Sequence, residues 1–284
     1  MKKIFLSVLG LLMFQANAQK LDNALLWKIT GNGLSKPSYL FGTIHITCDA
    51  TLDQNVMKAM DDTSQLYLEL DMDSPSMQAE MMGGMMMKDG VTMSSLVSAE
   101  DFAIVDKFLQ ETTGMSAKMM NNFKPFMITS LLIQQMLECP MQSFEMELQK
   151  VSKAQGEETY GLETVQEQLA VFDAIPYKEQ MDELVKTAKD NMVKDKAEFA
   201  KMMELYKKKE LENLMKLMAE SENKLYNEHN DLLLANRNNN WIPKIESIAK
   251  EKPTFFGVGA AHLAGEDGVI MLLRKKGYKV EAVK

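Results

Sequence analysis

Two kinds of hydrophobic pattern divide the chain. Short apolar or alternating runs near both ends predict strands, whereas from about 75 to 250 the apolar positions recur at helical spacing. Terminal strands need each other to complete a sheet, so the pattern predicts an α/β fold: one domain, 19–284, with a central mixed β-sheet from N- and C-terminal segments and a large helical insertion. The predicted strands are 25–31, 38–47, 65–71, 158–163, 253–262 and 278–283.

Capping residues mark where several of the predicted helices begin. Ser98 precedes one amphipathic run, and Thr164 with Glu167 forms a capping box ahead of another. Pro125 lies inside a long helical pattern, 117–138, where it predicts a kink. These signals predict several separate helices within the insertion.

The first eighteen residues have the pattern of a secretory signal peptide. Lys2 and Lys3 precede an apolar stretch, 4–14, and a small-residue cleavage site ends at Ala18. No other segment approaches the roughly 20 apolar residues of a membrane span. We therefore expect cleavage after Ala18, export to the periplasm or the exterior, and no membrane span in the mature chain.

The net charge limits which classes of partner the protein can bind, and the two cysteines bear on the expected oxidising compartment. The formal net charge of −8 makes nucleic acid an unexpected partner, since phosphate binding needs a basic surface. Cys48 and Cys139 are the two cysteines. In an oxidising compartment we expect them to form a disulfide, the alternative being two unpaired, buried thiols.

Two histidines end strand-like runs in the same frame. His45 closes "GTIH", and His262 closes "GAAH", more than two hundred residues later. A glycine near a strand end allows close approach of a backbone or ligand, and a histidine just beyond it can point to the rim of the sheet where ligands bind. The repeated frame predicts that both imidazoles lie at one site.

A carboxylate would complete such a site. Glu69 ends the third predicted strand, and two histidines with one carboxylate can hold a divalent ion that activates water. The alternative is that each histidine caps its strand and bonds to backbone. Glu163 lies where a strand meets a capped helix, so it is a second candidate acid; a favourable charge at the helix N-terminus is the other reading.

Arg237 is a further candidate, because arginine is rare in this lysine-rich chain. Its planar fork suits a carboxylate or the negative charge that develops on an attacked carbonyl oxygen. Pairing with a structural acid explains it equally well.

These motifs resemble those of the TraB/PrgY/GumN family, which includes the Tiki proteins. "GTIH", "LYLELD", "YGLET" and "GAAH" occur in order over nearly all of the mature chain. Tiki members are described as metal-dependent proteases acting on secreted signalling ligands, and the family is similar in fold to erythromycin esterase and a haem-binding ChaN group. The resemblance implies site roles for His45 and His262, with Glu69 or Glu163 as the active-site glutamate.

Two functions are compatible with these observations. The first is an exported metal-dependent hydrolase, such as a peptidase, acting on a peptide or small-molecule substrate. His45, His262 and Glu69 would hold Mn²⁺, Co²⁺ or Zn²⁺, Glu163 or Glu69 would move protons, and Arg237 would stabilise charge on the carbonyl. The second is a non-catalytic protein that binds a peptide or a small ligand such as haem in the same place.

Overall fold

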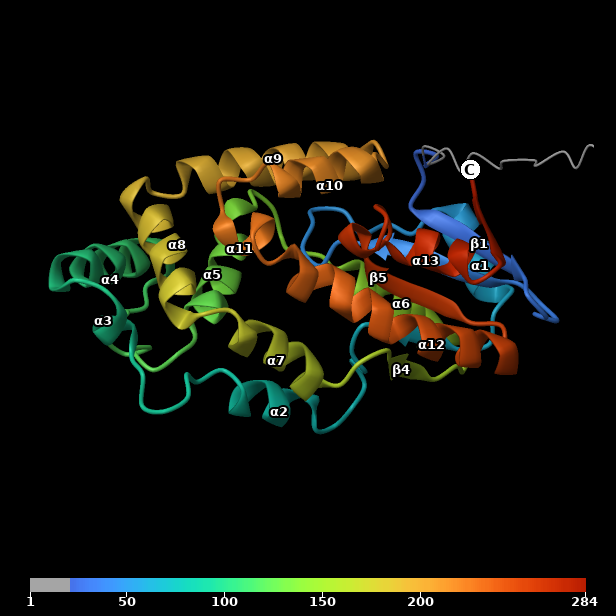
Figure 1. Cartoon of the computed structure of the whole chain (residues 1–284), viewed down its shortest axis with the longest axis horizontal. Helices are drawn as coiled ribbons and strands as arrows, with labels where there is room; N and C mark the ends of the chain where they lie inside the picture. The colour runs from blue at the N-terminus through green and yellow to red at the C-terminus, as the bar shows by residue number, and fades with distance from the viewer. Residues whose placement is uncertain (1–20) are drawn as a thin grey trace, which may run out of the picture.

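A six-stranded sheet forms the centre of the molecule. The computed structural model describes residues 21–284 (Figure 1); the predicted signal peptide lies outside them. The strand order is β4-β3-β5-β2-β1-β6. The strands are β1 (Leu26–Gly31), β2 (Ser38–Thr43), β3 (Leu66–Leu68), β4 (Thr159–Gly161), β5 (Phe255–Gly259) and β6 (Tyr278–Ala282).

The sheet is mixed, as predicted. β4, β3, β5 and β2 run parallel, whereas β1 is antiparallel to both β2 and β6. β5, near the C-terminus, lies between β3 and β2, which come from the first quarter of the chain. The N- and C-terminal segments therefore share one sheet, and the parallel strands end at a common edge.

Helices cover the sheet and bury its apolar side chains. α1 (Gln54–Asp61) links β2 to β3, and α6 (Phe144–Gln155) packs on the sheet through Phe144, whose ring centroid is 5.6 Å from that of Phe41. α12 (Asn236–Glu251) crosses in front of the sheet in Figure 1, next to α13 (Val269–Lys275). Trp27, Trp241 and Phe256 are fully buried in this core.

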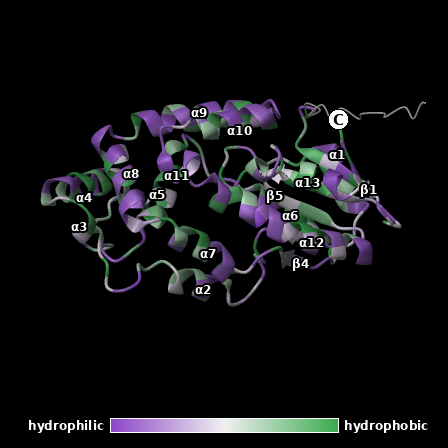
Figure 2. Cartoon of the chain, viewed as in Figure 1, coloured by the Kyte–Doolittle hydropathy of each residue, from purple (hydrophilic) through white to green (hydrophobic). Residues whose placement is uncertain are grey.

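The helical insertion has a core of its own. Besides α6, the insertion contains α2 (Met77–Gly83), α3 (Met93–Leu96), α4 (Ala99–Thr113), α5 (Pro125–Ile133), α7 (Val165–Ala174), α8 (Tyr177–Lys189), α9 (Val193–Lys207), α10 (Leu211–Ala219) and α11 (Lys224–Asn227). α4, α5 and α8 pack together around Leu109, Ile128 and Leu184, all fully buried. Figure 2 shows α9 to be largely hydrophilic along its outer side.

The predicted long helix at 117–138 is wrong. Pro125 is the first residue of α5, and turns precede it. Proline suits this position, because its missing N–H would have no partner there and its φ is already helical. Lys124, just before it, is 1% exposed and pairs with Asp173 at 2.6 Å. A distant partner thus fixes a helix start where the local pattern predicted a kink.

The predicted helix caps and the disulfide are confirmed. The Ser98 hydroxyl accepts from the Asp101 N–H at 3.0 Å, and Thr164 with Glu167 forms the expected capping box. Cys48 and Cys139 are bridged, with their Cα atoms 5.7 Å apart. Within residues 21–284, none of the helices has the length and apolarity needed to cross a membrane.

Candidate functional site

The two Gly-x-x-His frames begin within the last residues of two adjacent parallel strands, β2 and β5. β2 pairs with β5, and Thr43 lies opposite Gly259 in the register. A Cβ on Gly42 would lie 2.8 Å from the Leu263 side chain and 3.2 Å from the Ala260 backbone, so this glycine permits close packing between β2 and the turn that carries His262. The shared frame reflects two chain segments that leave the sheet side by side.

The predicted residues His45, His262 and Glu69 meet around Gly259. Glu69 directly follows β3, on the other side of β5. The position that a Cβ would take on Gly259 lies 3.2 Å from Glu69 Oε1, 3.6 Å from His262 Cδ2 and 3.8 Å from His45 Nε2. The expected convergence is therefore present, and glycine leaves the space for it.

Glu69 is a buried, ionised carboxylate with fixed partners. The Gly259 N–H donates to Oε1 at 2.8 Å, and Arg237 donates to Oε2 at 2.6 Å. Burial raises the pKa of Glu69, but the nearby His262, the Arg237 guanidinium and the Gly259 N–H together hold that pKa well below its usual range. Because His262 is itself neutral, we assign the effect at neutral pH to Arg237, to the charge of His45 and to the Gly259 N–H.

Arg237 lies at the centre of the cluster, with its side chain 12% exposed. Nη2 donates to Glu69 and to Glu163, each at 2.6 Å, while Nε donates to Glu163 at 3.2 Å. Nη1 donates to His262 Nε2 and to the Leu233 carbonyl, both at 3.0 Å. All five guanidinium N–H groups are thus engaged, and none is free for the predicted contact with a carbonyl oxygen.

The backbone around Arg237 is irregular. The residue follows a π-helical turn, Asp231–Ala235, that leads into α12. Such turns are frequent at functional sites, because the extra residue redirects the side chains that follow. Trp241, one turn further, supports the guanidinium, whose central carbon lies 4.9 Å from the ring centroid.

His262 is neutral and buried, with its side chain 4% exposed. Nδ1 is 2.6 Å from the side-chain oxygen Oδ1 of Asn238, and Nε2 accepts an N–H of Arg237, so the partners assign the proton to Nδ1. Burial lowers the pKa of His262 to about 3, with Arg237 adding to the effect and Glu69 opposing it. His262 therefore acts as an acceptor here.

Glu163 completes the buried pair of acids. It follows β4 as Glu69 follows β3, and its backbone N–H donates to the Glu69 carbonyl at 3.0 Å. Trp241 Nε1 donates to one carboxylate oxygen at 3.1 Å and Gln168 to the other at 3.1 Å. Sequence reasoning placed both acids at the rim, and the structure brings both to Arg237.

Glu145 belongs to the site but was missed by the sequence analysis. Its Oε1 lies 2.8 Å from His45 Nδ1, and the Ser143 hydroxyl donates to its Oε2 at 2.6 Å. Burial disfavours charge on His45, but the hydrogen bond and charge of Glu145 raise the pKa of His45 to about 9. No local signal in the sequence links Glu145 to a histidine one hundred residues earlier.

The loop that carries His45 is fastened to the start of α6. Thr47 and Gln142 exchange two backbone hydrogen bonds, of 3.0 and 2.8 Å, and the Cys48–Cys139 disulfide lies beside them. His45 remains accessible, because its side chain is 64% exposed. The imidazole is therefore held at Nδ1 and open to solvent.

The predicted metal-ligand set is not formed. Among the residues that the structure describes, no group of three or more His, Cys, Asp or Glu side chains is arranged to hold a metal ion. The atoms expected to bind the ion, His262 Nε2 and one oxygen of Glu69, already accept N–H groups of Arg237. His45, His262 and Glu69 come together as predicted, but the guanidinium of Arg237 already occupies the acceptor atoms of His262 and Glu69.

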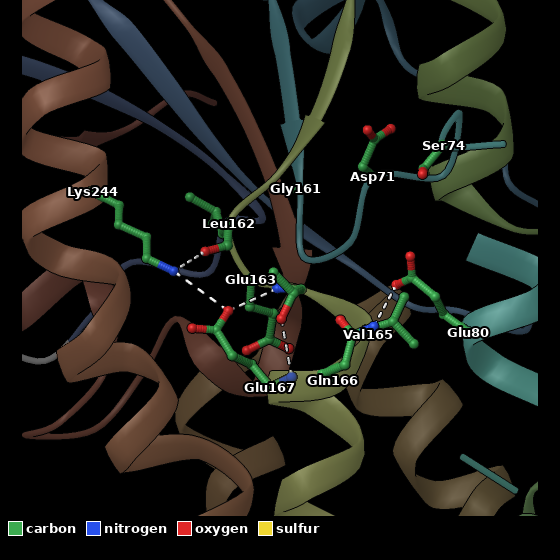
Figure 3. Close-up of a pocket in the computed structure, with 11 residues that line it drawn as sticks. Asp71, Ser74, Glu80, Gly161, Leu162, Glu163, Val165, Gln166, Glu167 and Lys244 are labelled. Carbon is green, nitrogen blue, oxygen red and sulfur yellow. Dashed lines mark hydrogen bonds and ion pairs between the residues drawn. The ribbon is translucent and has the colours of Figure 1, made fainter. Parts of the chain in front are cut away.

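A pocket of about 420 Å³ adjoins Glu163. Figure 3 shows Lys244 and Glu167 on one side of it and Asp71 and Ser74 on the other. Lys244 donates to the Leu162 carbonyl at 2.7 Å and lies 3.7 Å from Glu167, so both groups already share its charge. The pocket combines these charged groups with apolar surface from Leu162 and Val165.

The fold and this centre define an α/β protein with histidines, carboxylates and an arginine at the carboxyl ends of parallel strands. The model of the TraB/PrgY/gumN family matches residues 25–282. The chain therefore belongs to the TraB/PrgY/gumN family, as its motifs predicted. No curated protein and no solved structure matches the chain.

Proposed function

We propose that this protein is an exported hydrolase that cleaves a peptide bond or a related carbonyl compound at the centre around Gly259. The observation that carries the proposal is the state of His45. Its Nδ1 is bound by a buried carboxylate, whereas Nε2 faces the cluster from a ring that is 64% exposed. An imidazole held in this way can exchange a proton with a substrate or a water.

The proton transfer uses side chains of the chain alone. The neutral form of His45, which is the minor form at neutral pH because the pKa is about 9, takes a proton from water at Nε2 while the water oxygen forms a bond to the carbonyl carbon. The bond to the leaving group then breaks, and the same proton passes from Nε2 to the leaving atom. Glu145 pairs with the imidazolium between the two steps, as the buried acid does in other histidine-dependent hydrolases.

The buried residues Glu69, Glu163, Arg237 and His262 provide a fixed electrostatic environment and do not transfer the proton themselves. Glu69 and Glu163 are paired with Arg237, and His262 Nε2 accepts an N–H of Arg237, so the acceptors of these residues are already hydrogen-bonded within the cluster. His45 is the group with both access and basicity. The pocket beside Glu163 has both charged and apolar lining residues, which suits a substrate with peptide-like groups.

Turnover of a peptide and ester library tests the proposal. We expect hydrolysis that His45→Ala reduces by about 10²- to 10⁴-fold, the usual contribution of a general base. His229→Ala is the matched control, because His229 pairs with Glu179 of α8 at 2.7 Å, outside the cluster around Gly259, and the variant should leave the rate unchanged. The rate should also persist in a chelator.

The alternative of a binding protein predicts a different result. A peptide or haem that binds in a His45-dependent manner, without any product, would replace the hydrolase proposal with the binding one. Turnover that disappears in chelator and returns with Mn²⁺, Co²⁺ or Zn²⁺ would restore the metal-dependent version predicted from the sequence.

A further inference from the structure

Three acceptors of different residues converge on one guanidinium. Glu69 and Glu163 each contribute a carboxylate oxygen 2.6 Å from Arg237 Nη2, and His262 contributes Nε2 at 3.0 Å from Nη1. Their side chains are 9%, 5% and 4% exposed. Two carboxylates and an imidazole are also a donor set that holds Zn²⁺ and similar ions in proteins.

The hydrogen bonds that hold His262 and Glu69 in place are also of the kind found around metal ligands. A metal-binding histidine usually donates its other N–H to a neighbouring oxygen, and His262 Nδ1 does so to Asn238. One oxygen of Glu69 is fixed by the Gly259 N–H. What differs is the cation, which is the side chain of Arg237.

The charges explain why the Arg237 guanidinium and a divalent metal ion would exclude each other from this centre. Arg237 leaves the group of Glu69, Glu163 and neutral His262 with a formal charge of −1. A divalent ion added beside Arg237 would bring two cations within a few ångströms in a buried setting, where repulsion is weakly screened. A divalent ion in place of Arg237 would balance the two carboxylates and satisfy the lone pair of His262.

We infer that Arg237 is the resident cation of this centre and that it competes with divalent metal for Glu69, Glu163 and His262. The centre becomes a metal site only when the guanidinium is removed. This inference rests on the site used for the proposed function, but not on turnover, so metal binding tests it even if no substrate is found.

The test compares the thermal stability of mature, tag-free variants with and without metal. Arg237→Met removes the charge and all five donors at similar length, leaving two buried carboxylates unpaired, so it should lower the melting temperature. Zn²⁺ or Mn²⁺ should then raise the melting temperature of this variant by about 5 °C or more at a hundredfold excess over Kd. Wild type should not shift.

Two further variants separate the site from surface binding. Arg237→Lys keeps a positive charge, so it should gain much less from metal than Arg237→Met. Adding His262→Ala to Arg237→Met removes one of the three acceptors and should abolish most of the metal-dependent rise. A rise that survives in the double variant reflects binding elsewhere and counts against the inference.

Calorimetry on the wild type gives an independent reading. We expect no one-to-one binding of Zn²⁺, Mn²⁺ or Co²⁺ that depends on His262. Such binding in wild type would overturn the inference that Arg237 excludes divalent metal from these three residues. So would an Arg237→Met chain that gains no metal affinity over wild type, or that stays unfolded whether or not metal is present.

Discussion

The exposed imidazole of His45 differs from the buried one of His262 in a way that can be measured residue by residue. Glu145 raises the pKa of His45 to about 9, and burial lowers that of His262 to about 3. At neutral pH the first is mostly protonated and the second is neutral. With three histidines in the chain, each can be assigned by a single variant.

We predict that an NMR titration of His45 has its midpoint well above the ordinary value of about 6.5. Glu145→Gln removes the partner charge and should lower the midpoint by more than one pH unit. His229→Ala should leave it unchanged. An equal midpoint in wild type and Glu145→Gln would show that the ion pair does not control His45.

The same shift has a consequence for stability. A histidine whose folded pKa is raised stabilises the fold fully below its unfolded pKa, and this contribution is lost as the pH rises from about 6.5 through about 9. Since the side chain is 64% exposed, solvent screens the pair and the contribution is small. His262 works in the opposite sense, because its depressed pKa makes the fold less stable as the pH falls from about 6.5 towards 3.

Gly259 offers a second test at the scale of one atom. A Cβ at Gly259 would lie 3.2 Å from Glu69 Oε1, so we predict that Gly259→Ala displaces that carboxylate and destabilises the fold by about 1–3 kcal/mol. Gly83→Ala is the matched control: it has open space and lies in α2, so the change should be neutral or slightly stabilising. Chemical denaturation of both variants compares them, and equal effects would mean that crowding at Gly259 is relieved elsewhere.

At the scale of elements, α7 starts directly after Glu163, and its capping box fixes where that acid leaves β4. The Thr164 hydroxyl accepts from the Glu167 N–H at 3.1 Å, and Glu167 accepts from the Thr164 N–H at 2.8 Å. We predict that Thr164→Ala costs about 1 kcal/mol in urea unfolding. Ser98→Ala, at the cap of α4, should cost about the same.

The two cap variants should differ at the site. Only Thr164→Ala lies next to Glu163, so only this variant should alter the NMR signals of His262, which shares Arg237 with Glu163. If Ser98→Ala perturbs those signals equally, the effect is a general loss of stability rather than a local one.

The elements also show what the sequence could and could not predict. Strand patterns placed Glu69 and Glu163 at the rim because each follows a short apolar run, and the paired glycine frames placed both histidines there. The start of α5 and the partner of His45 were missed, since Lys124–Asp173 and His45–Glu145 are contacts between distant segments. Arg237 was a candidate because arginine is rare in this chain, but only the structure shows that it donates to the Glu69 and His262 atoms that a metal ion would need.

At the scale of the molecule, the disulfide ties the sheet to the insertion. Cys48 follows β2 and Cys139 precedes α6, a separation of 91 residues. We predict that Cys48→Ser with Cys139→Ser destabilises the protein by about 2–5 kcal/mol in urea unfolding. Reduced wild type should match the double variant. Unfolding of the variant at the wild-type midpoint would mean that the backbone bonds of Thr47 with Gln142 suffice.

The sheet is closed by two strands that follow the helical insertion in the sequence. β5 separates β3 from β2, and β6 pairs with β1, so neither the central parallel register nor its carboxyl edge exists before residues 255–282 are available. Strand pairings between such distant segments form slowly, because the entropy of closing a long loop is lost before the stabilising contacts form. A chain in which residues 255–282 have not yet docked therefore has His45 without its companions around Gly259, and the cluster assembles only together with these long-range strand pairings.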